Sequence, residues 1–174
     1  MKTEHSIEVG KFLYCSSLLE EEVAKTYRHL AESIRDKDIK CFLNYISDDS
    51  HKHAKVLMVL SEHLTSCNKP SFEECEKVLG SSWRNLMEKA KMIQEEFEID
   101  NRKLVELIDG LVRFEGVVAE EYLTVLSVKT IELMAKESEL NIELYKMIFE
   151  WIVEDEKRHE QILKLIKNLV TVGR

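Results

Sequence analysis

The chain has 174 residues, of which 44% are apolar and 33% charged, with one proline and five glycines. This composition is typical of long amphipathic helices, and the length fits a single domain, 1–174, that buries its own core. The net charge of −8 is spread along the chain without a basic stripe, which argues against a nucleic-acid partner. No run of 18 apolar residues and no signal-peptide core occur, so we expect a cytoplasmic protein with no membrane partner.

The first two predicted helices span about residues 5–35 and 38–66, separated by a short polar break. In each, one set of residues recurs in alternating steps of three and four, which places the set on the side of the helix that enters a core. The first set is Val9, Leu13, Ser16, Glu20, Val23, Tyr27, Leu30 and Ile34. The second set is Leu43, Ile46, Ser50, His53, Leu57, Leu60 and Leu64.

A crossover with short helices is predicted next. Pro70 bars continuation of the preceding helix, and Ser71 begins a capping-box sequence for a helix over 72–79. Gly80 ends that helix, and another begins at residue 81 or 82 and runs through residue 97.

The last two predicted helices span about residues 101–135 and 139–171, and each carries a stripe of the same kind. The third set is Leu104, Ile108, Leu111, Glu115, Val118, Tyr122 and Val125. The fourth set is Phe149, Ile152, Glu156, His159, Leu163, Ile166 and Val170.

The middle of every stripe carries carboxylate or imidazole groups, which are costly to bury unless they are paired or bind a metal. Glu156 and His159 alone could form a simple hydrogen-bonded pair at a helix crossing. Polar centres in all four stripes instead predict that these groups meet at one level of an antiparallel four-helix bundle.

The two halves of the chain also repeat the same pattern. The spacing Glu-x-x-Val-x-x-x-Tyr begins at Glu20 and again at Glu115, and His53 and His159 follow in the next helix of each half. Such a repeat predicts two helical hairpins related by a pseudo-twofold axis.

These residues make the chain similar to the ferritin-like di-metal carboxylate superfamily, and most of all to its rubrerythrin branch, here without a rubredoxin domain. The resemblance covers nearly the whole chain. It implies an all-α, antiparallel four-helix bundle of the ferritin-like type, with a long crossover containing short helices between the second and third long helices. The residues that carry it are Glu20 with Tyr27, His53-Ala54, Glu115 with Tyr122, and Glu156-x-x-His159-Glu160.

The resemblance also implies a ligand set. Glu20, Glu115 and Glu156 are the expected carboxylate ligands, and His53 and His159 the nitrogen ligands, one for each metal. Carboxylates and imidazoles without a thiolate suit iron, so two Fe ions are expected, with Mn or Zn as alternatives.

Tyr27 and Tyr122 are expected either to hydrogen-bond a carboxylate ligand or to serve only as aromatic core residues.

One position departs from the family pattern, which supplies a Glu-x-x-His from each of two helices. Ser50 stands three residues before His53, where that pattern has Glu. Asp49 could turn inward instead, Ser50 could hold a water molecule, the second ion could bind weakly, or the site could be inactive. Glu121 is a further candidate carboxylate.

The implied function is oxidase, ferroxidase or peroxidase-type redox activity on dioxygen or hydrogen peroxide. Because the chain has no Cys-x-x-Cys pair, it lacks a rubredoxin-like iron site and needs an external electron donor. A homodimer is expected by analogy. The alternatives are a non-catalytic metal-binding or iron-handling bundle, and a structural bundle with a degenerate site.

Four cysteines occur, Cys15, Cys41, Cys67 and Cys75. Cys67 and Cys75 flank the crossover proline and could close a small disulfide loop; otherwise they are thiols.

Overall fold

The computed structural model describes residues 4–65, 69–96, 98–116 and 142–172. Within these ranges the regular structure consists of α-helices, and no strand occurs, which confirms the predicted all-α class. The chain divides into two compact units, Met1–Glu98 and Ile99–Arg174, called here the N-terminal and C-terminal units.

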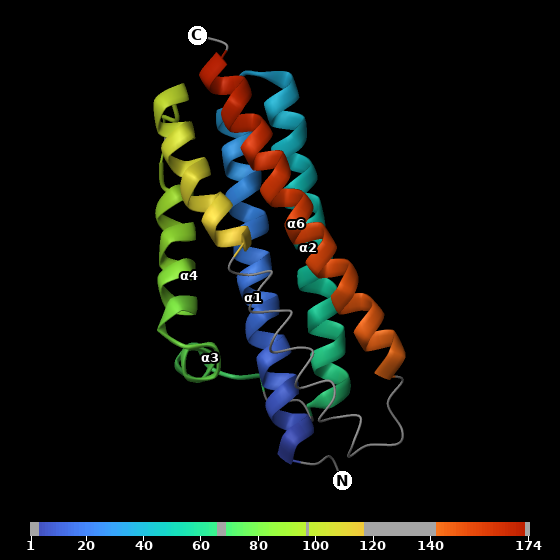
Figure 1. The fold of residues 1–174 in the computed structure, drawn as a ribbon. Coiled ribbons are helices and arrows are strands. Elements are labelled where there is room, and N and C mark those ends of the chain that lie inside the picture. Colours follow the sequence, from blue (N-terminus) through green and yellow to red (C-terminus); the bar gives the residue numbers. More distant parts are fainter. Residues whose placement is uncertain (1–3, 66–68, 97, 117–141, 173–174) are drawn as a thin grey trace. The chain divides into compact units, whose positions relative to one another are not determined.

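Two long helices, α1 (Glu4–Ser33) and α2 (Lys37–Leu64), form the frame of the N-terminal unit and lie antiparallel, side by side (Figure 1). The predicted polar break separates them because Asp36 caps α2. Its carboxylate accepts hydrogen bonds from the backbone N–H groups of Asp38 and Ile39, both at 3.0 Å. This hairpin is the one predicted from residues 5–35 and 38–66.

A glycine lets α1 approach α2 closely near the end of the hairpin. A Cβ atom added at Gly10 would lie 2.4 Å from the Cγ2 atom of Thr65, well inside contact distance. The buried backbone carbonyl of Gly10 accepts a hydrogen bond from Ser61 Oγ at 2.7 Å. Further along, Ser47 Oγ donates to the carbonyl of Ala24 at 2.8 Å, so buried hydroxyl groups fix the register of the two helices.

The crossover contains the two predicted short helices, α3 (Phe72–Leu79) and α4 (Ser81–Gln94), and both pack against α1. The capping box is confirmed: Ser71 Oγ accepts from the backbone N–H of Glu74, whose carboxylate accepts from the N–H of Ser71. Gly80 separates the helices with φ of 82°, in the region that favours glycine.

A disulfide between Cys15 in α1 and Cys75 in α3 joins the crossover to the long hairpin. The Cys67–Cys75 loop and the free Cys75 thiol, which the sequence left open as alternatives, are both excluded because the sulfur of Cys75 is bonded to Cys15. Both bonded cysteines are fully buried where α3 packs on α1, so packing of the helices, and not proximity along the loop, determines the partner. Cys41 is an exposed thiol, and Cys67 lies outside the described residues.

The C-terminal unit contains a helix over residues 101–116 and the long helix α6 (Ile142–Val172). Lys167 Nζ lies 2.6 Å from Asp109 Oδ1, while Glu115 lies near His159 earlier in α6, so the two helices run antiparallel. The predicted continuation of the third long helix to residue 135, and the first residues of the fourth, fall outside the described residues.

The four predicted stripes are confirmed wherever they are described. Every stripe residue in α1, in α2, in α6 and in residues 101–116 is buried, including the polar centres. Val118, Tyr122 and Val125 of the third stripe lie outside the described residues. The 3.6-residue period therefore predicted correctly which side of each helix faces the interior.

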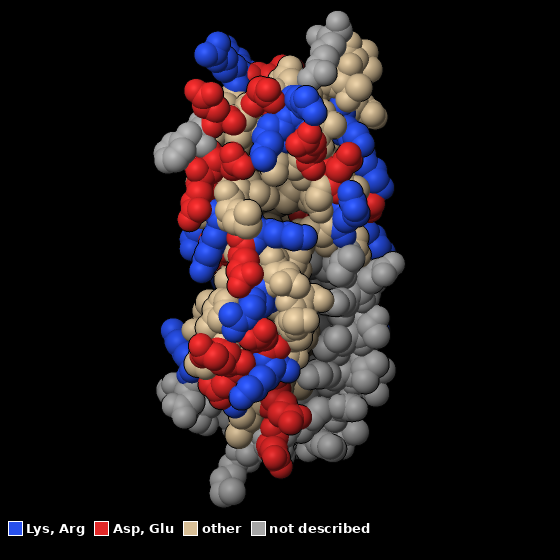
Figure 2. Space-filling model, turned by 90° about the vertical axis from the view of Figure 1, so that its left-hand side faces the viewer, with Lys and Arg blue, Asp and Glu red and all other residues tan. Residues whose placement is uncertain are grey.

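The surface shown in Figure 2 carries Lys and Arg side chains interspersed among Asp and Glu, and among the described residues on that face neither sign forms a continuous field. In the described part of the chain, no helix combines the length and the apolar character of a membrane span.

Candidate metal centre

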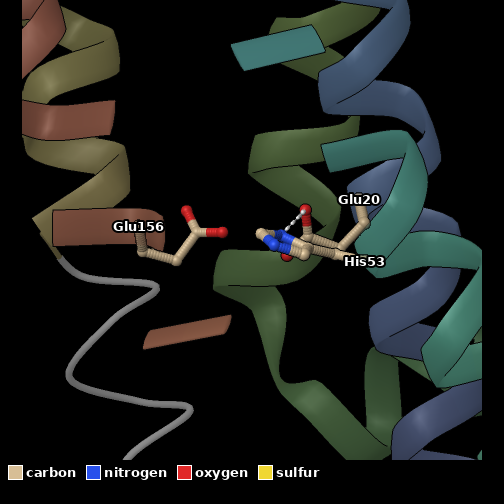
Figure 3. A group of neighbouring side chains, drawn as sticks. All are labelled: Glu20, His53 and Glu156. Atoms are coloured by element: carbon tan, nitrogen blue, oxygen red, sulfur yellow. Dashed lines mark ion pairs between the residues drawn. The ribbon is translucent and has the colours of Figure 1, made fainter. Parts of the chain in front are cut away.

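In the N-terminal unit, the polar centres of α1 and α2 meet as a buried pair, Glu20 and His53. Both side chains are almost fully inaccessible, and Glu20 Oε2 lies 3.9 Å from His53 Nδ1. Figure 3 shows the carboxylate and the imidazole directed toward one another across the helix pair. Glu156, also drawn there, extends from α6.

In the C-terminal unit, Glu115, Glu156 and His159 form a buried group of three. His159 Nδ1 lies 3.5 Å from Glu156 Oε2 and 3.6 Å from Glu115 Oε2. Each of the three residues offers one ligand atom, and these atoms all lie within 4.8 Å of one another. The i, i+3 spacing of Glu156 and His159 places both on the same face of α6, opposite the carboxylate from residues 101–116.

Two carboxylates and one imidazole share this interior, and the carboxylates carry like charges when both are ionised. Burial raises the pKa of Glu115 well above its ordinary value, and the charge of Glu156 and a hydrogen bond with it raise that pKa further. The neighbouring His159 opposes this increase in the pKa. A divalent cation would supply the missing positive charge and allow both carboxylates to stay ionised.

The separations between these atoms also fit a bound ion. A nitrogen–oxygen hydrogen bond spans about 2.7–3.2 Å, shorter than any of the three histidine–carboxylate separations above. Two ligand atoms that bind one ion at about 2.0–2.2 Å lie roughly 3.0–3.5 Å apart, depending on the coordination angle. The separations in the C-terminal unit, 3.5 and 3.6 Å, are close to this range, and the 3.9 Å separation in the N-terminal unit is wider.

The two units repeat one arrangement, as the sequence repeat predicts. Each brings a glutamate on its first helix beside a histidine on the next long helix of the chain: Glu20 with His53, and Glu115 with His159. The C-terminal unit differs by the additional carboxylate of Glu156, which has its sequence counterpart in Ser50.

Ser50 is buried on the same side of α2 as His53, as the stripe predicts. Asp49 faces away from that position, and its Oδ1 atom lies 2.7 Å from Lys52 Nζ. The described geometry therefore does not bring a carboxylate from α2 to the side of His53, and the inward-turned Asp49 stays an untested alternative.

Of the three further candidates Tyr27, Tyr122 and Glu121, the structure describes only Tyr27. Tyr27 is completely buried in α1, seven residues after Glu20. Tyr122 and Glu121 lie outside the described residues. The role of Tyr27 beside a ligand stays a prediction.

Neighbouring titratable groups are engaged elsewhere. Glu21 Oε2 lies 2.7 Å from His51 Nδ1 at the surface, and His29 Nε2 lies 2.9 Å from the backbone carbonyl of Glu96. Glu160 forms an ion pair with Lys164 on the exposed side of α6. Within the described residues, the groups of His, Cys, Asp and Glu suited to an ion contain only residues that the sequence predicted as ligands.

Comparison of the chain with known protein families, with curated proteins and with solved structures gives no match. The resemblance to ferritin-like proteins consequently rests on the quoted residues and on their burial.

Proposed function

We propose that this chain is a di-metal carboxylate protein of the rubrerythrin-like type, built on a ferritin-like four-helix bundle, that performs redox chemistry on hydrogen peroxide or dioxygen. Iron is the proposed metal, with two ions per chain and one histidine for each ion. We propose that a separate redox protein donates the electrons for repeated turnover; these 174 residues contain no Cys-x-x-Cys pair.

The observation that carries this proposal is the buried group Glu115, Glu156 and His159. A protein interior tolerates two carboxylates beside one imidazole only when protons or a cation neutralise them. The ligand types are oxygen and nitrogen without sulfur, which favours iron or manganese over copper(I) or a structural zinc site.

The second pair supports the same assignment. Glu20 and His53 repeat the glutamate and histidine of the C-terminal unit, with the same helix order. A single buried Glu–His couple is often structural, but two copies at equivalent positions of an internal repeat are better explained by two equivalent ligand sets.

Glu20, Glu115, Glu156, His53 and His159 would hold the iron, which would supply the two electrons that reduction of hydrogen peroxide to two waters requires, together with two protons from solvent. The chain's own residues fix the ligands and limit access of solvent. The apolar stripe residues Ile152 and Leu163 flank Glu156 and His159 in sequence and are buried with them, which keeps bulk water from the carboxylates.

Anaerobic titration of Fe(II)-loaded protein with hydrogen peroxide tests this function. We expect about two Fe(II) ions to be oxidised for each peroxide consumed, as the two-electron reduction requires. Remaining Fe(II) is measured with a chelating dye after each addition. Glu156→Gln should abolish the oxidation of Fe(II) by peroxide. The matched change Glu154→Gln, at an exposed position of the same helix, should leave this oxidation unchanged. Iron that stays bound and ferrous after peroxide addition would contradict the redox function.

A further inference from the structure

A second face of α6, beside the buried one, exposes large apolar side chains on both sides of its middle. Trp151 is 53% exposed, Leu165 47% and Leu169 46%. Among the described residues, six of the ten exposed large hydrophobic side chains belong to this one helix. Four of these six, Leu144, Trp151, Leu165 and Leu169, lie on one line along the helix, and apolar side chains gathered on one face mark a contact surface.

The line has the spacing of a coiled-coil seam. From residue 144 to residue 169 its positions follow in strictly alternating steps of four and three, the a and d positions of heptads. Six of these eight positions are apolar and two are charged. We call the set the α6 seam: Leu144, Ile148, Trp151, Asp155, Arg158, Ile162, Leu165 and Leu169.

The two charged residues lie at the centre of the seam and have opposite signs. Arg158 Nη1 lies 2.6 Å from Asp155 Oδ1 within the same helix. In a parallel, in-register pair of α6 helices, each of these charges would face its own like charge. In an antiparallel pair related by a twofold axis midway between them, Asp155 faces Arg158 of the second copy, and Arg158 faces Asp155.

The same axis maps the rest of the seam onto itself. Positions equally distant from the midpoint of residues 155 and 158 are again seam positions, and each a position meets a d position, as antiparallel coiled coils require. The resulting contacts between the copies join Leu144 to Leu169, Ile148 to Leu165, Trp151 to Ile162, and Asp155 to Arg158. A surface that is complementary to itself in both apolar pattern and charge fits an isologous contact.

We propose that the α6 seam is a homodimer contact, in which two copies of this chain pack their α6 helices antiparallel about a twofold axis between Asp155 and Arg158. The central charged pair fixes register and direction, a role that polar residues at core positions of coiled coils commonly serve. Trp151 is the expected main contributor to affinity, since large aromatic side chains near the middle of an interface carry much of the binding energy. The dimer does not depend on bound metal.

Sedimentation equilibrium of the full chain over a range of concentrations tests the contact. The wild type should be dimeric, and Trp151→Glu should be monomeric while keeping its helical circular dichroism. Val59→Glu places the same charge at another exposed apolar position, on α2, and should stay dimeric. A wild type that stays monomeric at every concentration, or a dimer insensitive to Trp151→Glu, overturns the proposal.

The charged centre offers a test of direction and register. Asp155→Arg should weaken dimerisation by at least about tenfold, and the exchange Asp155→Arg with Arg158→Asp should restore it, because opposite charges then face one another again. Oxidative cross-linking gives the direction independently in a background with Cys41→Ser and Cys67→Ser. Leu144→Cys with Leu169→Cys should link two chains, and Leu144→Cys alone should not. Efficient linking by Leu144→Cys alone would show a parallel contact and overturn the proposal.

Discussion

Glu115→Gln should stabilise the protein freed of cations while weakening its binding of iron. The amide keeps the shape of the carboxyl group but stays neutral without a proton, whereas the buried Glu115 beside Glu156 must take up a proton on folding because its pKa is raised. We expect a gain of about 1 kcal/mol, which is roughly 2–4 °C in melting temperature for a chain of this size. Loss of a carboxylate ligand should weaken Fe(II) binding by at least about tenfold. Thermal melting with and without Fe(II) measures both effects.

The stabilisation should depend on pH in a defined direction. The folded-state pKa of Glu115 is raised, chiefly by burial and then by Glu156, so folding favours the protonated form. Its contribution to stability is fully present below the unfolded-state pKa, about 4.3, and is lost as pH rises through the folded-state pKa. As pH rises from the unfolded-state to the folded-state pKa of Glu115, the cation-free wild type should therefore lose stability and Glu115→Gln should not. The difference in melting temperature between the two proteins should widen over this range.

Glu106→Gln is the matched control for both measurements, since Glu106 is exposed on the same helix and forms a surface ion pair with Arg102. It should shift neither melting temperature nor metal affinity appreciably, because exposed ion pairs contribute about 0–1 kcal/mol. Equal melting curves for wild type and Glu115→Gln at all pH values would show that burial does not disfavour the ionised form of Glu115. Undiminished iron binding would show that Glu115 is not a ligand.

Cys75→Ser should lower the free energy of unfolding by about 4 kcal/mol in the chain-entropy description of a disulfide. The bond spans 60 residues of sequence, so it restricts the unfolded chain strongly. Replacing it also leaves a polar hydroxyl in a fully buried position between α1 and α3. Urea unfolding monitored by Trp fluorescence is a suitable measurement, because Trp83 donates a hydrogen bond to the backbone carbonyl of Cys15 at 3.1 Å.

Cys41→Ser serves as the control for the disulfide, since Cys41 is an exposed thiol on α2, and it should leave the urea midpoint nearly unchanged. Reduction of the wild type should reproduce the loss seen in Cys75→Ser and should have no further effect on that variant. Peptide mapping without reduction should recover Cys15 joined to Cys75. Recovery of Cys75 joined to Cys67 would contradict the described pairing.

Most of the candidate ligands were predictable from the sequence because a helix has a fixed period. Glu20, His53 and Glu156 fall in step with apolar neighbours, so the side of the helix that buries those neighbours buries the polar groups as well. The capping box at Ser71 was predictable for a local reason, since its two hydrogen bonds join residues only three positions apart.

Features that depend on packing between distant segments could not be predicted in this way. The partner of Cys75 is decided by how α3 packs on α1, and the pairing that the cysteine spacing suggested as an alternative, Cys67 with Cys75, is not the one found. The ion pair of Asp49 with Lys52 likewise competes with an inward orientation that spacing alone allowed.

The α6 seam is a third case. Its heptad spacing can be read from the sequence, but each of its positions from 148 to 169 directly precedes a position of the stripe that enters the core. Only the exposure of residues such as Trp151 and Leu165 distinguishes the second face from the first.

The most direct test of the central claim, that the buried glutamates and histidines are metal ligands, is the number of iron ions bound per chain. Elemental analysis after anaerobic loading with Fe(II) and removal of excess metal gives this number for the wild type and for His53→Ala with His159→Ala. We predict two ions per wild-type chain and loss of both in the double variant. A wild type without bound iron, or a double variant with the same iron content as the wild type, would contradict the account.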